Sequence, residues 1–125
     1  GGEAPSCPGS ARDGPHPYMK KVLFVCSRNR LRSPTAEVLF AAVPGIETDS
    51  AGLADDATCP LAADQLEWAD IVCVMEKRHR ALLARRFKSH LHGKKVVCLD
   101  IPDKFEFMQP ELIELLEKRA LRHLR

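Results

Sequence analysis

The feature that most constrains the fold is a set of short, continuous apolar runs. They occupy residues 22–26 (VLFVC), 71–75 (IVCVM) and 96–99 (VVCL). Apolar runs of this length without alternation are typical of strands that are buried on both faces. Segments with the apolar spacing of amphipathic helices follow at residues 77–88 and from residue 109 onward. This alternation predicts an α/β fold with three layers, in which a four-stranded parallel sheet carries helices on both faces.

Two more elements belong to the predicted domain. A helix is expected over residues 35–42, with Ser33 suited to its N-cap and Pro34 to its first position. A short strand is expected near residues 46–50, ended by an Ala-Gly pair at residue 52. Because ligands of parallel sheets bind at the carboxyl ends of the strands, the functional site is expected at that edge.

The first part of the chain differs from the rest. Residues 1–18 contain four prolines and four glycines without apolar periodicity, so we predict a disordered tail before a single domain over residues 19–125. No apolar run is long enough to span a membrane, and no apolar segment typical of a signal peptide is present. We therefore expect no membrane association.

Cysteine usage indicates the compartment. The five cysteines form an odd set without a Cys-x-x-Cys pair, and Cys26, Cys73 and Cys98 lie in or at the ends of apolar runs. This pattern predicts reduced, buried thiols in a cytoplasmic protein and not a disulfide framework. The formal net charge of +2 is too small to argue for a nucleic-acid partner, and a monomer is expected.

The candidate chemistry follows the first predicted strand. Five residues separate Cys26, which ends that strand, from Arg32, which precedes a helix. A loop of this length can direct its backbone N–H groups inward, where they bind a phosphate dianion and stabilise a thiolate. Arg32 can bind two phosphate oxygens, and Ser33 can donate its hydroxyl to the thiolate. The alternative is that Cys26 is an inert core cysteine, as we expect for Cys73 and Cys98.

Taken together, these residues resemble the signature of the low-molecular-weight protein tyrosine phosphatases. The matching positions are Val25, Cys26, Asn29, Arg32, Ser33, Pro34, Ala36 and Glu37, with further likeness at residues 50–52, 69–75 and 100–103. The resemblance implies a phosphomonoester hydrolase that acts through a thiophosphate intermediate without a cofactor or metal. Its substrate would be a phosphorylated protein or small molecule.

The resemblance also implies individual roles. Cys26 would be the nucleophile, Arg32 the phosphate clamp and Asp103 the general acid. From the residues alone, Asp100 and Asp103 are equal candidates, and the family pattern favours Asp103. Ser50 would hydrogen-bond a left-handed Asn29. The phosphate-binding loop would comprise Ser27, Arg28, Asn29, Arg30, Leu31 and Ser33.

Three features depart from the family pattern. Only 18 residues separate Gly52 from Ile71, so we expect the family's helix and aromatic loop to be absent there and the site to be open. Phe105 could stack on an aromatic leaving group or pack on the last helix. Arg28 and Arg30 favour a strongly anionic substrate if they face the pocket, and are plain surface charge if they do not.

The sequence contains a basic stretch whose binding partner is not determined by its composition. Residues 77–95 contain eight Lys or Arg and three histidines but no acid. This stretch could bind an anionic partner such as RNA or a phosphorylated protein, or it could be a solvated helix face. The histidines lack the spacing of a metal site, so no metal is expected.

Two other functions share this loop. A non-catalytic module could bind phosphorylated ligands with the same backbone N–H groups. A thiol-dependent arsenate reductase would need two further mobile cysteines, yet Cys73 and Cys98 lie in predicted strands and leave only Cys59 in a loop.

Overall fold

The computed structural model describes residues 20–28, 32–54, 57 and 59–124. The predicted tail therefore lies outside the described residues. Asn29, Arg30 and Leu31 of the predicted phosphate-binding loop also lie outside them.

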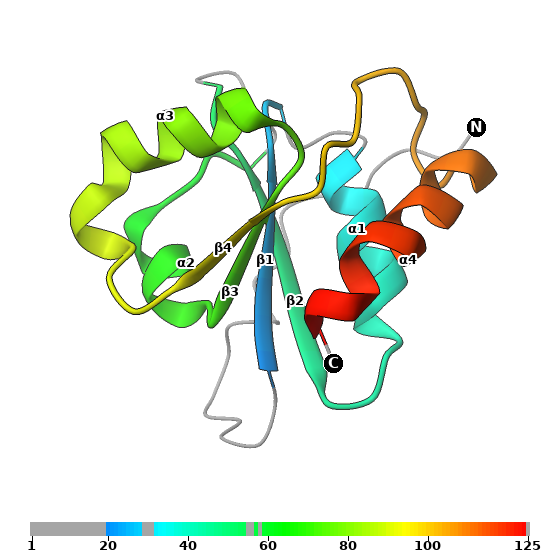
Figure 1. The fold of residues 1–125 in the computed structure, drawn as a ribbon, viewed down its shortest axis with the longest axis horizontal. Coiled ribbons are helices and arrows are strands. Elements are labelled where there is room, and N and C mark those ends of the chain that lie inside the picture. Colours follow the sequence, from blue (N-terminus) through cyan, green and yellow to red (C-terminus); the bar gives the residue numbers. More distant parts are fainter. Residues whose placement is uncertain (1–19, 29–31, 55–56, 58, 125) are drawn as a thin grey trace.

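Four strands form one all-parallel sheet, which confirms the predicted fold class. Their order in the sheet is β2-β1-β3-β4, so the first strand lies in the interior of the sheet. The sheet twists through the centre of the molecule (Figure 1). The strands are β1 (Lys20–Cys26), β2 (Ile46–Gly52), β3 (Ile71–Val74) and β4 (Lys95–Cys98).

Helices cover both faces of the sheet. One face carries α1 and α4, and the other carries α2 and α3 (Figure 1). A short 3₁₀ helix, η2 (Lys88–His90), follows α3 directly. The helices are α1 (Arg32–Ala41), α2 (Ala63–Trp68), α3 (Lys77–Phe87) and α4 (Pro110–Leu124).

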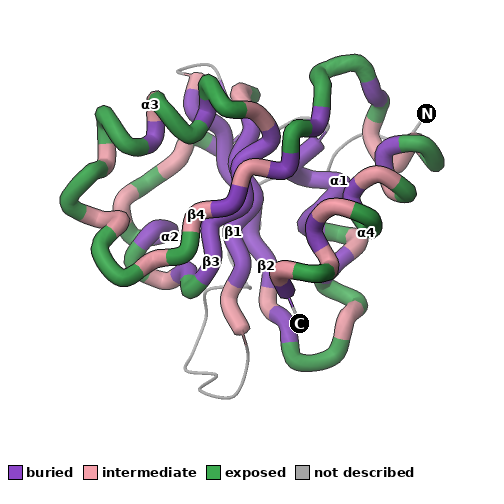
Figure 2. The backbone as a smooth tube through the Cα atoms, in the orientation of Figure 1, coloured by how far each residue is buried: buried purple, intermediate pink, exposed green. Residues whose placement is uncertain are grey.

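The interior position of β1 explains why its residues 22–26 are all apolar. Successive side chains of a strand point to opposite faces. Val22, Phe24 and Cys26 accordingly belong to the core under α1 and α4, whereas Leu23 and Val25 belong to the core under α2 and α3. Figure 2 shows the buried residues gathered along the strands and on the inner sides of the helices.

Two local predictions are wrong. Helix α1 begins at Arg32 and not at residue 35, so Ser33 lies inside the first turn and is not the N-cap. A short helix, α2, is present between β2 and β3, where we expected none. The side chain of Gln65 accepts the N–H of Ala62 and donates to Asp49 beneath it. The contact with Ala62 caps the helix locally, whereas that with Asp49 is tertiary, and six residues are too few to show helical periodicity.

The thiols follow the prediction in part. Cys26, Cys73 and Cys98 are reduced thiols as predicted, although Cys98 is only partly buried, and Cys59 takes part in a disulfide. Within residues 20–28, 32–54, 57 and 59–124, no helix is long and apolar enough to cross a membrane.

Candidate active site

The predicted phosphate-binding loop starts at a strand end that is hydrogen-bonded on both sides. Cys26 ends β1 beside the end of β3, where the N–H of Met75 donates to the carbonyl of Val25 at 3.1 Å. The carbonyl of Cys26 accepts the N–H of Leu53 at 3.0 Å. A Cβ at Gly52 would lie 2.7 Å from the Ser27 carbonyl, so glycine is needed for this close approach. The segment after β2 therefore packs directly against the start of the loop.

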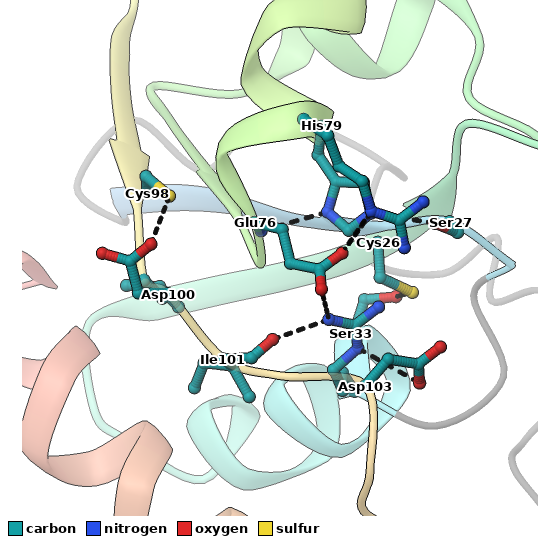
Figure 3. A network of polar contacts seen from close by, with 12 residues as sticks. Cys26, Ser27, Ser33, Glu76, His79, Cys98, Asp100, Ile101 and Asp103 are labelled. Carbon is teal, nitrogen blue, oxygen red and sulfur yellow. Dashed lines mark hydrogen bonds and ion pairs between the residues drawn. The ribbon is translucent and has the colours of Figure 1, made fainter.

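The nucleophile candidate is buried beside a hydroxyl. Cys26 is 3% exposed, and its Sγ lies 2.9 Å from Oγ of Ser33 in the first turn of α1 (Figure 3). When Cys26 is a thiolate it can only accept, so Ser33 donates. The hydroxyl of Ser33 is therefore placed to donate to the sulfur from the first turn of α1.

Arg32 is buried and held from three sides. Its side chain is 2% exposed, and Nη1 donates to the carbonyl of Ile101 at 2.6 Å. The same Nη1 lies 3.6 Å from Oε1 of Glu76, and Nε lies 3.7 Å from Oδ1 of Asp103. A guanidinium fixed in this way is already oriented when a phosphate arrives, which lowers the entropy lost on binding.

Glu76, at the turn between β3 and α3, was missed by the sequence analysis. Its carboxylate contacts Arg32, Arg78 and the ring of His79 (Figure 3). Burial acts to raise the pKa of Glu76, but the hydrogen bond to Arg78 and the charge of Arg32 hold that pKa below its usual range. Glu76 is therefore an anion that balances Arg32. The one sequence signal for such a residue is indirect: a buried arginine requires a carboxylate partner.

The two aspartates of the last loop have different surroundings. Asp103 lies at Arg32, with its side chain 57% exposed. Asp100 adopts a φ of +54°, and its carboxylate accepts from Sγ of Cys98 at 3.5 Å (Figure 3). Arg119 donates to the Asp100 carbonyl. Of the two candidates, the fold brings Asp103 next to the phosphate clamp and directs Asp100 to β4.

Ser50 lies behind the loop, fully buried on β2. Its hydroxyl donates to a carboxylate oxygen of Glu37 on α1. Burial raises the pKa of Glu37 to about 7, although the Ser50 hydrogen bond acts to lower it and the charge of Asp49 adds to the rise. The predicted bond from Ser50 to Asn29 falls on a residue outside the described part of the chain.

The remaining predicted site residues lie at the margin. Phe105 is 9% exposed and packs with Leu112 and Leu116 of α4. Of its two predicted roles, this is packing on the last helix and not stacking on a leaving group. Ser27 is partly buried beside α3, and Arg28 is exposed. Among the described residues, no group of three or more His, Cys, Asp or Glu could hold a metal ion.

Comparison with solved structures bears on this geometry. The chain matches the YwlE arginine phosphatase of Geobacillus stearothermophilus (TM-score 0.67, 24% identity, covering 83% of this chain and 92% of that one). It also matches the tyrosine phosphatase Wzb of Escherichia coli K30 in complex with phosphate (0.68, 21%, 85% and 96%). A third match is the Erwinia amylovora tyrosine phosphatase AmsI (0.64, 27%, 82% and 89%).

The chain has the low-molecular-weight protein tyrosine phosphatase fold. The resemblance predicted from the Cys26–Arg32 segment is therefore confirmed, and these matches are all phosphatases. No protein-family model matches the chain, and no curated protein sequence does. Within this fold, the Cys26 thiol contacts the Ser33 hydroxyl, and the Arg32 guanidinium contacts the Asp103 carboxylate.

Proposed function

We propose that the protein is a cysteine-dependent phosphomonoester hydrolase. The observation that carries the proposal is the buried guanidinium of Arg32, which lies next to Asp103 and follows the loop that Cys26 begins. A dianionic phosphoryl group would bind between the thiol and the guanidinium, with two oxygens on Arg32. No cofactor is required by this chemistry.

In the first step, the Cys26 thiolate attacks phosphorus. A sulfur–phosphorus bond forms while the bond to the leaving oxygen breaks, and protonated Asp103 donates its proton to that oxygen. Arg32 stabilises the charge on the transferred phosphoryl oxygens. The exposure of Asp103 suits this role because a leaving group must approach it from solvent.

In the second step, water attacks the thiophosphate. The Asp103 carboxylate accepts a proton from the water, the sulfur–phosphorus bond breaks, and phosphate leaves. Ser33 stabilises the departing thiolate through its hydroxyl, at the 2.9 Å distance seen here. A solved arginine phosphatase with a similar fold carries a phosphorylated serine in place of its active-site cysteine, which supports a covalent intermediate.

The surroundings favour a phosphorylated protein with acidic residues near the phosphate. Lys77, Arg78 and Arg80 are exposed in the first turn of α3, which begins at the Glu76 contact with Arg32. Bases at a helix N-terminus oppose the helix dipole. Arg78 is offset by its ion pair with Glu76, so Lys77 and Arg80 are the charges that we assign to a partner. By contrast, α4 has Glu111 first and Arg122 last, the favourable order.

Two other observations bear on the alternative chemistries. Burial raises the pKa of Cys73 to about 12, and Cys59 takes part in a disulfide. Both properties argue against a thiol relay of the arsenate-reductase kind. A phospho-binding module without turnover would use the same clamp, and the experiment below separates it from an enzyme.

The test is hydrolysis of para-nitrophenyl phosphate against pH by wild type, Cys26→Ser and Asp103→Ala. We expect wild-type turnover, none above background for Cys26→Ser, and a loss of about 10²–10³ in kcat for Asp103→Ala, the usual size of general-acid catalysis. Asp100→Ala is the matched control and should retain most activity. Turnover by Cys26→Ser would end the proposal, and phosphate binding without wild-type turnover would favour the binding module.

A further inference from the structure

His79 lies at the site but takes no part in the two steps above. It is fully buried in the first turn of α3. The backbone N–H of Glu76 donates to its Nδ1 at 3.1 Å, and its Nε2 lies 2.9 Å from Oγ of Ser27 (Figure 3). A buried imidazole thus connects the α3 turn to the residue that follows the nucleophile.

These contacts determine the tautomer of the ring. Nδ1 accepts from a backbone N–H, so in the neutral ring the proton must be on Nε2. Nε2–H therefore donates to Ser27, with Oε2 of Glu76 at 3.4 Å as a second, weaker acceptor.

The ring also stays neutral. Burial lowers the pKa of His79 to about 4, and the neighbouring charge of Arg32 acts in the same direction. Arg78 adds to this effect, while Glu76 and Asp103 oppose it. A single proton on Nε2 is therefore the state of the ring at neutral and mildly acidic pH, where it can act only as a donor to Ser27.

Ser27 is held on two sides as a result. Its carbonyl accepts the N–H of Ala54 at 2.7 Å from the segment after β2, and its hydroxyl accepts from His79 on α3. Two fixed points on one residue limit rotation of the peptide units that follow Cys26. The N–H groups of a phosphate-binding loop must converge, so small rotations there weaken anion binding.

We propose that His79 is a positioning residue of the phosphate-binding loop, acting through the hydrogen bond from its Nε2–H to the hydroxyl of Ser27. The proposal rests on the proposed function in that the loop after Cys26 binds the phosphoryl group. The competing role is purely structural: Nδ1 could matter only because it accepts the Glu76 N–H at the start of α3.

Two conservative variants separate these roles. The amide nitrogen of glutamine reaches the place of Nε2, so His79→Gln keeps a donor for Ser27 but loses the acceptor at the place of Nδ1. The amide oxygen of asparagine reaches the place of Nδ1, so His79→Asn keeps an acceptor for Glu76 but loses the donor. Positioning through Ser27 predicts that Gln preserves function, whereas a structural role predicts that Asn does.

The readouts are inorganic phosphate affinity by calorimetry, kcat and KM for para-nitrophenyl phosphate, and the thermal midpoint. We expect His79→Asn to lose about tenfold in phosphate affinity and in kcat/KM, the value of one hydrogen bond. His79→Gln should stay within about threefold of wild type, a smaller loss than a complete hydrogen bond. His90→Asn, at the end of η2, is the control and should change neither phosphate affinity nor kcat/KM.

Ser27→Ala supplies the second test and does not depend on how the His79 variants fold. If His79 acts through Ser27, Ser27→Ala alone lowers phosphate affinity, and adding His79→Asn lowers it no further. Additive losses, wild-type affinity in Ser27→Ala, or better function in His79→Asn than in His79→Gln would each overturn the proposal. Wild type that binds phosphate without turnover ends the proposed function alone, and wild type that does not bind phosphate overturns both.

Discussion

At the scale of single residues, the site depends on one buried positive charge and its partly exposed partners. Arg32 is almost fully buried, and Glu76 and Asp103, whose side chains are 26% and 57% exposed, supply the opposite charge within 4 Å. Removing these carboxylates would leave the buried guanidinium uncompensated, which is costly. Glu37 is the exception, because its raised pKa of about 7 allows it to remain protonated beside Asp49.

Glu37 should make the stability of the protein depend on pH. Its folded pKa of about 7 lies above the value of 4.5 for the free group, so the folded state keeps a proton that the unfolded state releases. Stability from this group is thus present below pH 4.5 and is lost as the pH rises towards 7, by roughly 2–3 kcal/mol in total. Denaturant titrations at several pH values should show this decline in wild type and a flatter profile in Glu37→Gln.

The control is Glu117→Gln on the exposed side of α4. It should follow the wild-type profile. A Glu37→Gln protein whose free energy of unfolding falls with pH as steeply as that of wild type would assign the slope to another group.

At the scale of elements, the turn between β3 and α3 connects the chemistry to the surface. Glu76 contacts the buried Arg32 on one side and the exposed Arg78 on the other. The basic residues of α3 therefore begin next to the Glu76–Arg32 ion pair. Residues 77–95 contain eight Lys or Arg without an acid, whereas the rest of the chain has eleven against all seventeen Asp and Glu. This asymmetry favours a partner with negative charge beyond the phosphate itself.

The α3 surface is tested by the double variant Lys77→Gln with Arg80→Gln. Each exposed charge contributes up to about 1 kcal/mol, so KM for a phosphopeptide with acidic flanks should rise roughly threefold to tenfold. KM for para-nitrophenyl phosphate, which has no flanks, should not change. Added salt should diminish the difference between the two proteins.

The matched control removes two charges from α4, by Lys118→Gln with Arg122→Gln, both exposed. It should leave both KM values as in wild type. If both double variants raised KM for the phosphopeptide equally, the net charge of the protein and not the α3 surface would account for the increase. A larger effect on a 5′-phosphorylated oligoribonucleotide than on the peptide would assign the surface to nucleic acid.

At the scale of the whole molecule, the two cores share one strand. Phe24 belongs to the core under α1 and α4, and Val25 to the core under α2 and α3. Neither core can loosen without exposing side chains of β1, so we expect a single cooperative unfolding transition, as is usual for one domain of this size.

Leu83→Ala on α3 and Leu116→Ala on α4 test this coupling, since both side chains are fully buried in different cores. Each should cost about 2–5 kcal/mol and lower the same thermal midpoint by roughly 10 °C or more. Val38→Ala, at an exposed position of α1, should change the midpoint little. Two separate transitions in either leucine variant would show that the faces unfold independently.

The sequence alone predicted the parallel sheet, the flanking helices other than α2, and the positions of Cys26 at the end of β1 and Arg32 beside α1. Apolar runs and helical periodicity report local burial, and a cysteine at a strand end before a helix start has few geometries open to it. The last helix was predicted from residue 109 onward and begins at Pro110, because proline and an early acid mark a helix start.

Only the tertiary structure decided which side chains meet at the loop. The sequence does not distinguish Asp100 from Asp103 as the general acid. In the structure, Asp100 has a left-handed backbone and its carboxylate contacts Cys98, whereas the carboxylate of Asp103 contacts Arg32. The contacts of His79 join residues 52 positions apart, and that of Glu76 with Arg32 spans 44 positions, so no local pattern records them. Phe105 is buried in the core with Leu112 and Leu116. Long-range packing sets these contacts, and packing exists only once the chain has folded.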